Sequence, residues 1–299
     1  MMKWLIVNSP IESRISNDIM SFLVSHQIDT MRFECSGEQS GCINDIYGTL
    51  QEITHIILLL NEAAEYQSVI QYISGYTAGR DIPLYIVGKT GASVPWNLQC
   101  AVICPDPEVL KEKLENNFDY FLAVDEQRRA HKKLYDQGIP LTSDCLASFV
   151  TAGDIDTASM FLTAGISVNA RDSDGTPMLC VAARAEQTDM INLFITKGAD
   201  IDAVSSDRGY SAVMDAVWKS RYEMVKILVD AGANLNFVSR DGQTALVLAV
   251  GAGNEPICEL LSTHGADVNM KDRMGMSALD YAKLFKKENL VSLFTAAKG

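Results

Sequence analysis

The chain has 299 residues, of which 47% are hydrophobic and 21% are charged, and its formal net charge at pH 7 is −13. This composition is ordinary for a globular protein and the length allows two domains, so bulk disorder is excluded. An acidic chain repels phosphate groups, which argues against nucleic acid or an anionic membrane as its main partner.

The first residues of the chain, 1–10, contain too short an apolar run for a signal peptide and no small-residue cleavage pattern. No apolar stretch approaches the roughly 20 residues that span a bilayer. The seven cysteines have no paired short spacing, which is typical of buried thiols in a reducing compartment and not of a zinc site. We therefore expect a cytoplasmic protein with no membrane span and no bound metal.

Short apolar runs in the first third of the chain alternate with amphipathic stretches and predict five β-strands. These runs are Trp4–Val7, Thr30–Phe33, His55–Leu60, Leu84–Val87 and Ala101–Cys104. Helices are predicted near residues 12–26, 62–78 and 107–116, with a weaker one near 43–52. Near-continuous apolar strands separated by helices indicate a parallel sheet covered on both faces. Residues 1–116 are therefore predicted to form a doubly wound α/β domain.

Three segments of this domain resemble the middle of a Toll/interleukin-1 receptor (TIR) domain. They are the strand in residues 50–61, the motif Gly75-Tyr76-Thr77-Ala78 after Tyr66-Gln67-Ser68, and the strand that opens with Ile82-Pro83. Related nucleoside-processing folds carry a Glu-x-Gly-Tyr-Ala helix at this place. The resemblance implies a TIR/flavodoxin-like fold, self-association into a homo-oligomer and, in the NAD-cleaving members, a catalytic glutamate on that helix.

The glutamate of that family is missing from the matching helix. The aligned positions are Ile73 or Ser74, whereas Glu62 and Glu65 lie two to three turns earlier, where carboxylates commonly complement a helix dipole. A neutral side chain cannot stabilise an oxocarbenium-like state as a carboxylate does. We therefore favour a domain without enzymatic activity or a cofactor. The alternative is a glycosidase that cleaves NAD or a nucleoside, with Glu62 or Glu65 as its acid and NAD bound.

Residues 117–142 are predicted to be a helical connector. In the run Asp125–Lys133, acidic residues precede basic ones at helical spacing, which favours a helix. Gly138 and Pro140 end it. We interpret the arginine and lysine cluster of this run as a solvated helix face, with a docking patch as the alternative.

Glycines mark a repeat of 33 or 34 residues in the second half of the chain. One set closes short apolar helical stretches, and a second set follows it at ten or eleven residues: Gly165, Gly198, Gly232 and Gly265, then Gly175, Gly209, Gly242 and Gly275. A helical hairpin of this size cannot bury its apolar face alone, so the units must stack as a solenoid. Residues 143–299 are therefore predicted to be an all-α repeat domain.

The units resemble the ankyrin repeat. The resemblance rests on Gly-Ala-Asp or Gly-Ala-Asn motifs that begin at Gly198, Gly232 and Gly265, and on the run 277–282 in the family's Thr-Pro-Leu-His-x-Ala position. It predicts units near 172–204, 205–238, 239–270 and 271–299, preceded by a partial capping unit. The family's histidine is replaced, which puts its usual hydrogen bonds between units in question. The replacements are Cys180, Met214, Val247 and Asp280.

Ankyrin repeats bind protein partners on a concave face, and the resemblance places that face on the inner helices and the loop tips. The residues it assigns to partner binding are Arg171, Arg184, Arg208, Tyr210, Trp218, Lys219, Arg240, Arg273, Met274 and Met276. Tyr210 and Trp218 are the predicted anchors, because aromatic residues are enriched at interface centres. The alternative is that Trp218 packs against a neighbouring unit and the tip charges are only solvated. The sequence thus favours a cytoplasmic interaction module or scaffold.

Overall fold

The computed structural model describes residues 2–35, 46–59, 67–80, 82–88 and 101–296. The chain divides into two compact units, Met1–Glu126 and Gln127–Gly299, and each is described here by itself.

Within the described residues of the first unit, five strands form one parallel sheet. They are β1 (Lys3–Asn8), β2 (Asp29–Glu34), β3 (His55–Leu59), β4 (Leu84–Val87) and β5 (Val102–Cys104). The spatial order is β2-β1-β3-β4-β5, and every neighbouring pair is parallel. The predicted strands are confirmed, with ends that agree within one residue. The near-continuous burial of β1 and β3 is what a sheet covered on both faces requires.

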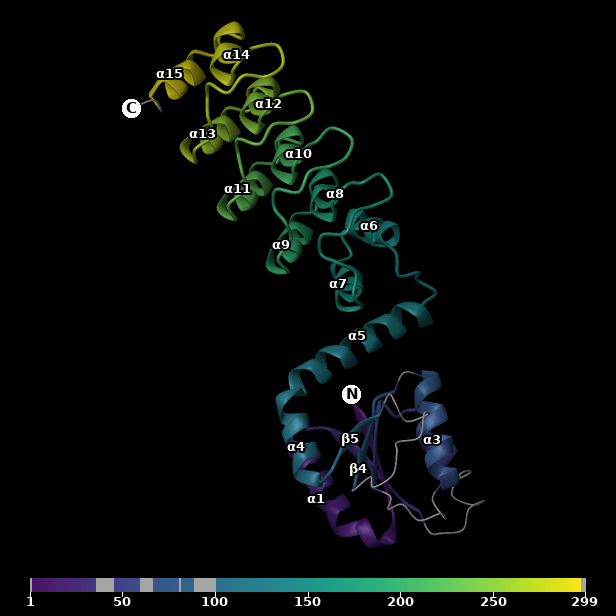
Figure 1. Cartoon of the computed structure of the whole chain (residues 1–299). Coiled ribbons are helices and arrows are strands. Elements are labelled where there is room, and N and C mark those ends of the chain that lie inside the picture. The colour runs from purple at the N-terminus through teal and green to yellow at the C-terminus, as the bar shows by residue number, and fades with distance from the viewer. Residues whose placement is uncertain (1, 36–45, 60–66, 81, 89–100, 297–299) are drawn as a thin grey trace. The chain divides into compact units, whose positions relative to one another are not determined.

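Helices cover both faces of this sheet (Figure 1). Alternate residues of β1 point to opposite sides, so Trp4 and Ile6 belong to one buried cluster whereas Leu5 and Val7 belong to another. The first cluster is completed by α1 (Ser13–Ser25) and α4 (Pro107–Asn116), and a short 3₁₀ helix, η1 (Pro10–Glu12), precedes α1. The second cluster is completed by α3 (Gln67–Arg80) and a helical turn at residues 46–50.

The helix α5 (Phe118–Asp136) runs across the division between the units and lies in the segment predicted as a connector. Its first turns belong to the first unit, where the Phe121 ring packs edge-on against Trp4 at a centroid distance of 6.3 Å. Its last turns belong to the second unit, where Ala130 and Leu134 are buried in the hydrophobic core.

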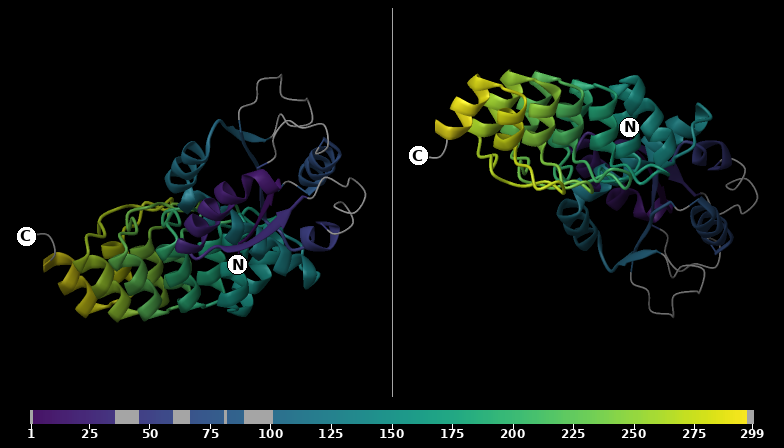
Figure 2. Two further views of the ribbon diagram at one scale, coloured as in Figure 1. Left: turned by 90° about the horizontal axis from the view of Figure 1, so that it is seen from below. Right: turned by 90° about the horizontal axis from the view of Figure 1, so that it is seen from above.

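After α5, the described residues of the second unit form five helix pairs. They are α6 and α7 (Ser143–Ala152, Ile155–Thr163), α8 and α9 (Met178–Arg184, Thr188–Thr196), α10 and α11 (Ala212–Trp218, Tyr222–Asp230), α12 and α13 (Ala245–Ala252, Glu255–Thr263), and α14 and α15 (Ala278–Leu284, Glu288–Ala296). The first helix of each pair contacts the first helix of the next, and the second helices pack likewise, which gives two layers. The loops lie along one side of the helix pairs, as Figure 2 shows, and Figure 1 shows them beside the first helices. We call the layer of first helices, which contains α6, α8, α10, α12 and α14, the inner layer.

The two glycine sets lie at the predicted turns of these units. All eight have positive φ, for example +81° at Gly198 and +79° at Gly242. An L-residue with a β-carbon is strained in this left-handed region, so glycine is the residue that lets each helix pair end and each loop tip turn. The predicted repeat is therefore confirmed in its geometry.

A ladder of side-chain hydrogen bonds joins neighbouring units. Asn169 accepts from the amide of Asp200 at 2.8 Å, Asp202 accepts from Asn234 at 2.8 Å, and Asn236 accepts from Asp267 at 2.7 Å. Each acceptor is the second polar residue of a Gly-Ala-Asp or related motif, and each donor begins the same pair in the next unit. The repeated Asp or Asn thus satisfies a backbone amide that the stack would otherwise leave unpaired.

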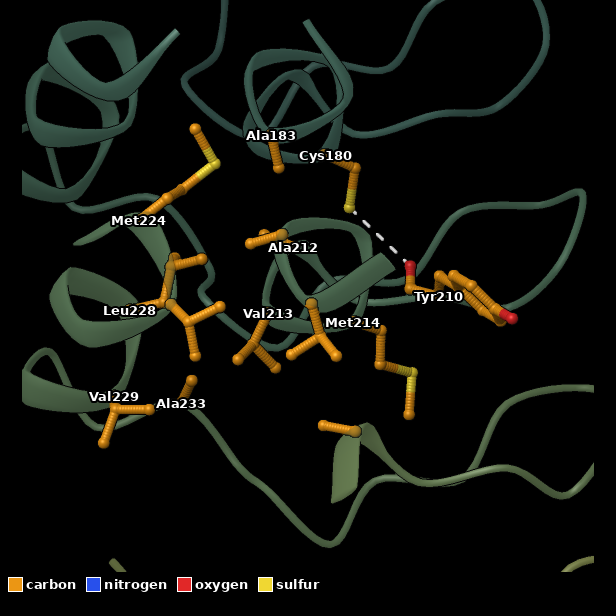
Figure 3. Packing of buried hydrophobic residues seen from close by; sticks show 14 of the residues in the cluster. Cys180, Ala183, Tyr210, Ala212, Val213, Met214, Met224, Leu228, Val229 and Ala233 are labelled. Atoms are coloured by element: carbon orange, nitrogen blue, oxygen red, sulfur yellow. Dashed lines mark hydrogen bonds between the residues drawn. The ribbon is translucent and has the colours of Figure 1, made fainter. Parts of the chain in front are cut away.

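The positions of the missing family histidine are filled in three different ways. The thiol of Cys180 donates to the carbonyl oxygens of Ala203 and Tyr210, at 3.5 and 3.7 Å, and so keeps a bond to the following unit (Figure 3). Met214 and Val247 are buried in the apolar core. Asp280 instead forms a capping box with Ser277 inside its own unit. The hydrogen bonds expected from the histidine are therefore kept in part at one unit, replaced by packing at two, and replaced by a capping box in the last.

Candidate functional site

A group of charged side chains lies at the middle of the inner layer. Asp215, in α10, is only 1% exposed. Its Oδ2 accepts from Nε of Arg184 in α8 at 3.0 Å, and its Oδ1 lies 3.5 Å from Nη2 of Arg208 in the preceding loop. Arg184 also donates from Nη2 to Oδ1 of Asp207 at 2.9 Å. This charged cluster, Arg184, Asp207, Arg208 and Asp215, fixes two arginines on adjacent units.

The two aspartates of the charged cluster have opposite pKa shifts. Burial raises the pKa of Asp215 to about 6, because it outweighs the favourable charges of Arg184 and Arg208. Burial also acts on Asp207, but hydrogen bonds from Arg184 and Ser205 prevail and hold its pKa below its usual range. A raised carboxyl pKa means that the folded state keeps the proton of Asp215 to a higher pH than the unfolded chain does.

We expect the raised pKa of Asp215 to make the stability of the second unit depend on pH. The contribution of Asp215 is most favourable below about pH 4 and falls as the pH rises to about 6, by on the order of 2–3 kcal/mol. Urea unfolding of the wild type and of Asp215→Asn, compared between these pH values, should show the wild type losing stability relative to the variant. Asp207→Asn is the control, because the lowered pKa of Asp207 moves its titration below about pH 4, so the difference in stability between the wild type and this variant should change little between these pH values. A wild type that gains on Asp215→Asn as the pH rises would contradict the assignment.

Tyr210, a predicted anchor, supports this cluster from within. Its side chain is 4% exposed, its hydroxyl donates to Oε1 of Gln243 at 3.3 Å, and the guanidinium of Arg208 lies 4.8 Å from its ring centroid. The ring therefore holds Arg208 by a cation–π contact and offers little surface to a partner. Its role as a partner-binding anchor stays a prediction, and the structure shows that its ring lies among Arg208 and Gln243.

Trp218, the other predicted anchor, ends α10 with 58% of its side chain exposed. Beside it, Lys219 lies 3.7 Å from Glu186, which also pairs with Arg221. A tryptophan in the core of a solenoid is buried, whereas a solvent-exposed indole beside a basic side chain is typical of a binding interface. Trp218 and Lys219 therefore lie together on the accessible end of the inner helix.

The remaining predicted residues lie on the loop tips. Arg171 donates to the carbonyl oxygens of Gly175 and Val204, at 2.8 and 2.7 Å, so it fastens two tips together. Arg240 is exposed, and Arg273 lies 3.9 Å from Asp241. Met274 is 81% exposed, whereas Met276 is partly buried. At the loop tips, hydrogen bonds thus hold Arg171 in place, whereas Arg240 and Met274 are accessible to a partner.

Two features of this face are absent from the sequence-based set. One is Asp215, which occupies the position of Val181 and Leu248 in the neighbouring units. An acid in an apolar column of the repeat alignment is the signal that could have found it. The other is Leu284, the exposed last residue of α14.

The alternative hypothesis places a catalytic acid in the first unit. Glu62 and Glu65, the candidate acids of the alternative hypothesis, lie outside the described residues. Among the residues that the structure describes, no three histidine, cysteine or acidic side chains gather as a metal would require. Within the same residues, no helix has both the length and the apolar composition that crossing a membrane demands.

Comparisons with known proteins agree with the repeat architecture. A family model of ankyrin repeats in three copies matches residues 145–239 and 231–298. An ankyrin repeat-containing protein of Treponema pallidum (strain Nichols) is 32% identical over 245 residues, which cover 82% of this chain and 82% of that protein. The B-cell lymphoma 3 protein homolog of Mus musculus is 34% identical over 107 residues, or 36% of this chain and 24% of that protein. The similarity to the Treponema protein is longer than the repeats and therefore includes part of the first unit.

Proposed function

Because this chain belongs to the ankyrin repeat family, we propose that it is a protein-interaction module that holds a protein partner on the inner helices and the loops before them. The observation that carries the proposal is the exposed Trp218 beside Lys219, next to the two arginines that Asp215 fixes. Tryptophan and arginine supply most of the binding energy at many interfaces, since each buries a large area and has a polar handle.

The charged cluster supports this surface by pre-organisation. Arg184 makes ionic hydrogen bonds to two aspartates, and Arg208 is held by Tyr210 and Asp215. A side chain that is already ordered loses less conformational entropy when a partner binds. The face therefore offers a partner fixed guanidinium groups, whereas Trp218 offers apolar area.

The role of the first unit is the second part of the proposal. Its strand order, β2-β1-β3-β4-β5, is the order of flavodoxin-like doubly wound folds, which supports the TIR/flavodoxin-like assignment. We place this domain at residues 1–116, the connector at 117–142 and the repeats at 143–299, with the first domain as a docking or self-association platform of a scaffold. The unpaired, buried thiols of Cys104, Cys180 and Cys258 support a reducing, cytoplasmic location.

The test is affinity capture with the purified full-length chain as bait, in lysate of the cells that express it. We expect proteins enriched by the wild type to be lost with the double variant Trp218→Ala, Lys219→Glu and to remain with Tyr135→Ala, a control that truncates another exposed aromatic residue of the second unit. Removal of a central aromatic anchor costs about 2 kcal/mol or more, a factor of about 30 in affinity. Partners that stay bound to the double variant would contradict the proposal.

A further inference from the structure

Equivalent positions at the ends of four inner helices differ sharply in size. Arg184, Trp218 and Leu284 are the last residues of α8, α10 and α14, and Gly251 is the matching position near the end of α12. These residues are 34, 33 and 33 positions apart, which is the repeat period. The inner layer therefore carries one glycine in a row of large side chains.

The space above Gly251 is open. A β-carbon built on Gly251 would meet no heavy atom within 4 Å, and its φ is not in the positive region that favours glycine. Glycine inside a helix is about 1 kcal/mol less favourable than alanine. Neither backbone geometry nor packing therefore requires glycine here. Its effect is that no side chain projects from α12 at this position.

Exposed apolar side chains stand on both sides of this position. Trp218 is 58% exposed on α10, and Leu284 and Phe285 are 62% and 47% exposed at the end of α14. The helix α12 packs against both α10 and α14. Packed helices lie about 8–10 Å apart, so α10 and α14 are separated by roughly 16–20 Å, enough for one helix of about 10–12 Å diameter above α12.

Basic side chains flank the same surface. Lys283 and Lys286 adjoin Leu284 and Phe285, and within the described part of the chain neither forms an ion pair. Glu186, the acid near Trp218, is already shared by Lys219 and Arg221. Asp280 is a further acid beside these bases, and hydrogen bonds from Ser277 and the charge of Lys283 lower its pKa. The four basic side chains therefore outnumber the two acids Glu186 and Asp280, in contrast with the net charge of −13 for the whole chain. Complementarity therefore favours an occupant that carries acidic residues.

We propose that this surface binds an acidic amphipathic helix of a partner protein. One apolar side chain of that helix lies over Gly251, between Trp218 on one side and Leu284 with Phe285 on the other, and its carboxylates face Lys283 and Lys286. The inference rests on the proposed function and adds the chemical class of the partner. Helices that dock in this way present apolar residues three and four positions apart.

The test uses two dye-labelled synthetic peptides and fluorescence anisotropy with the full-length chain. Both peptides carry leucines three and four positions apart, and the remaining positions are mainly glutamate in one and mainly lysine in the other. We expect the glutamate peptide to bind the wild type at least about tenfold more tightly, with an affinity that falls as salt rises. Failure of the glutamate peptide to bind, or equal binding of the lysine peptide, would overturn the proposal.

Two variants locate the site. Gly251→Trp should fill the space above α12 and weaken glutamate-peptide binding about tenfold or more, without lowering the melting temperature, because tryptophan is a better helix former than glycine. Lys283→Glu with Lys286→Glu should abolish the preference for glutamate. Tyr135→Ala should change neither. Unaltered binding by Gly251→Trp would place the peptide elsewhere and refute the site. Captured partners that still depend on Trp218 while the peptide fails would reject this inference and leave the proposed function standing.

Discussion

Replacing Phe194 with alanine is expected to lower the free energy of unfolding of the second unit by about 3–5 kcal/mol. Phe194 is fully buried on α9, within the core that runs through the helix pairs. Truncation removes the transfer free energy of the ring and leaves a cavity that rigid neighbouring helices cannot fill. Each repeat is held by its neighbours. A loss of this size in a unit that has a neighbour on each side therefore weakens both adjoining interfaces.

The measurement is urea unfolding followed by far-ultraviolet circular dichroism. Phe285→Ala is the matched control, since Phe285 is 47% exposed and its ring stacks on that of Tyr281. The control should lose no more than about 1.5 kcal/mol, the value of an aromatic pair. If both variants lose the same amount, Phe194 does not belong to a closely packed core.

Replacing Gly242 with alanine is expected to destabilise the second unit more than the same change at Gly275. Both glycines have nearly equal positive φ, +79° and +76°, so the strain of the left-handed conformation, about 1–2 kcal/mol, is common to the two variants. The two positions differ in the space that is available for a β-carbon. A β-carbon on Gly242 would lie 2.7 Å from the backbone nitrogen of Arg273, whereas one on Gly275 would meet nothing within 4 Å. The overlap adds about 1–3 kcal/mol.

The pair therefore separates backbone conformation from contact between units. Denaturant midpoints of Gly242→Ala, Gly275→Ala and the wild type should fall in that order, from lowest to highest. Equal loss in the two variants would mean that neighbouring loop tips do not approach each other as closely as they do here. An unchanged midpoint for Gly275→Ala would mean that φ strain contributes little at these tips.

The repeat was predictable from the sequence because its turns and the hydrogen bonds between its units each require particular residue types. A glycine at each left-handed position and an Asp or Asn at each inter-unit bond recur every 33 or 34 residues, and each serves a backbone requirement that few other residues meet. The strands of the first unit were predictable for a related reason. Residues buried on both faces of a sheet, such as those of β3, form a continuous apolar run that is easy to recognise.

The candidate site was less predictable, because burial on a repeat surface depends on how each loop packs against the next unit. Tyr210 follows a loop glycine as an exposed residue would, yet it is covered by Arg208 and Gln243 from two different loops. Asp215 lies in an apolar column, and only the structure shows the two arginines that justify it. The opening above Gly251 has no sequence signal beyond a missing side chain.

Cross-linking of a captured partner through lysines tests the central claim, that the partner occupies the inner layer. Lys219 and Lys283 lie at the ends of inner helices. Lys197, directly after α9, and Lys226, in α11, are exposed on the layer of second helices. We predict partner cross-links, read by mass spectrometry, at Lys219 and Lys283. Cross-links confined to Lys197 and Lys226 would place the partner on the opposite layer and contradict the account.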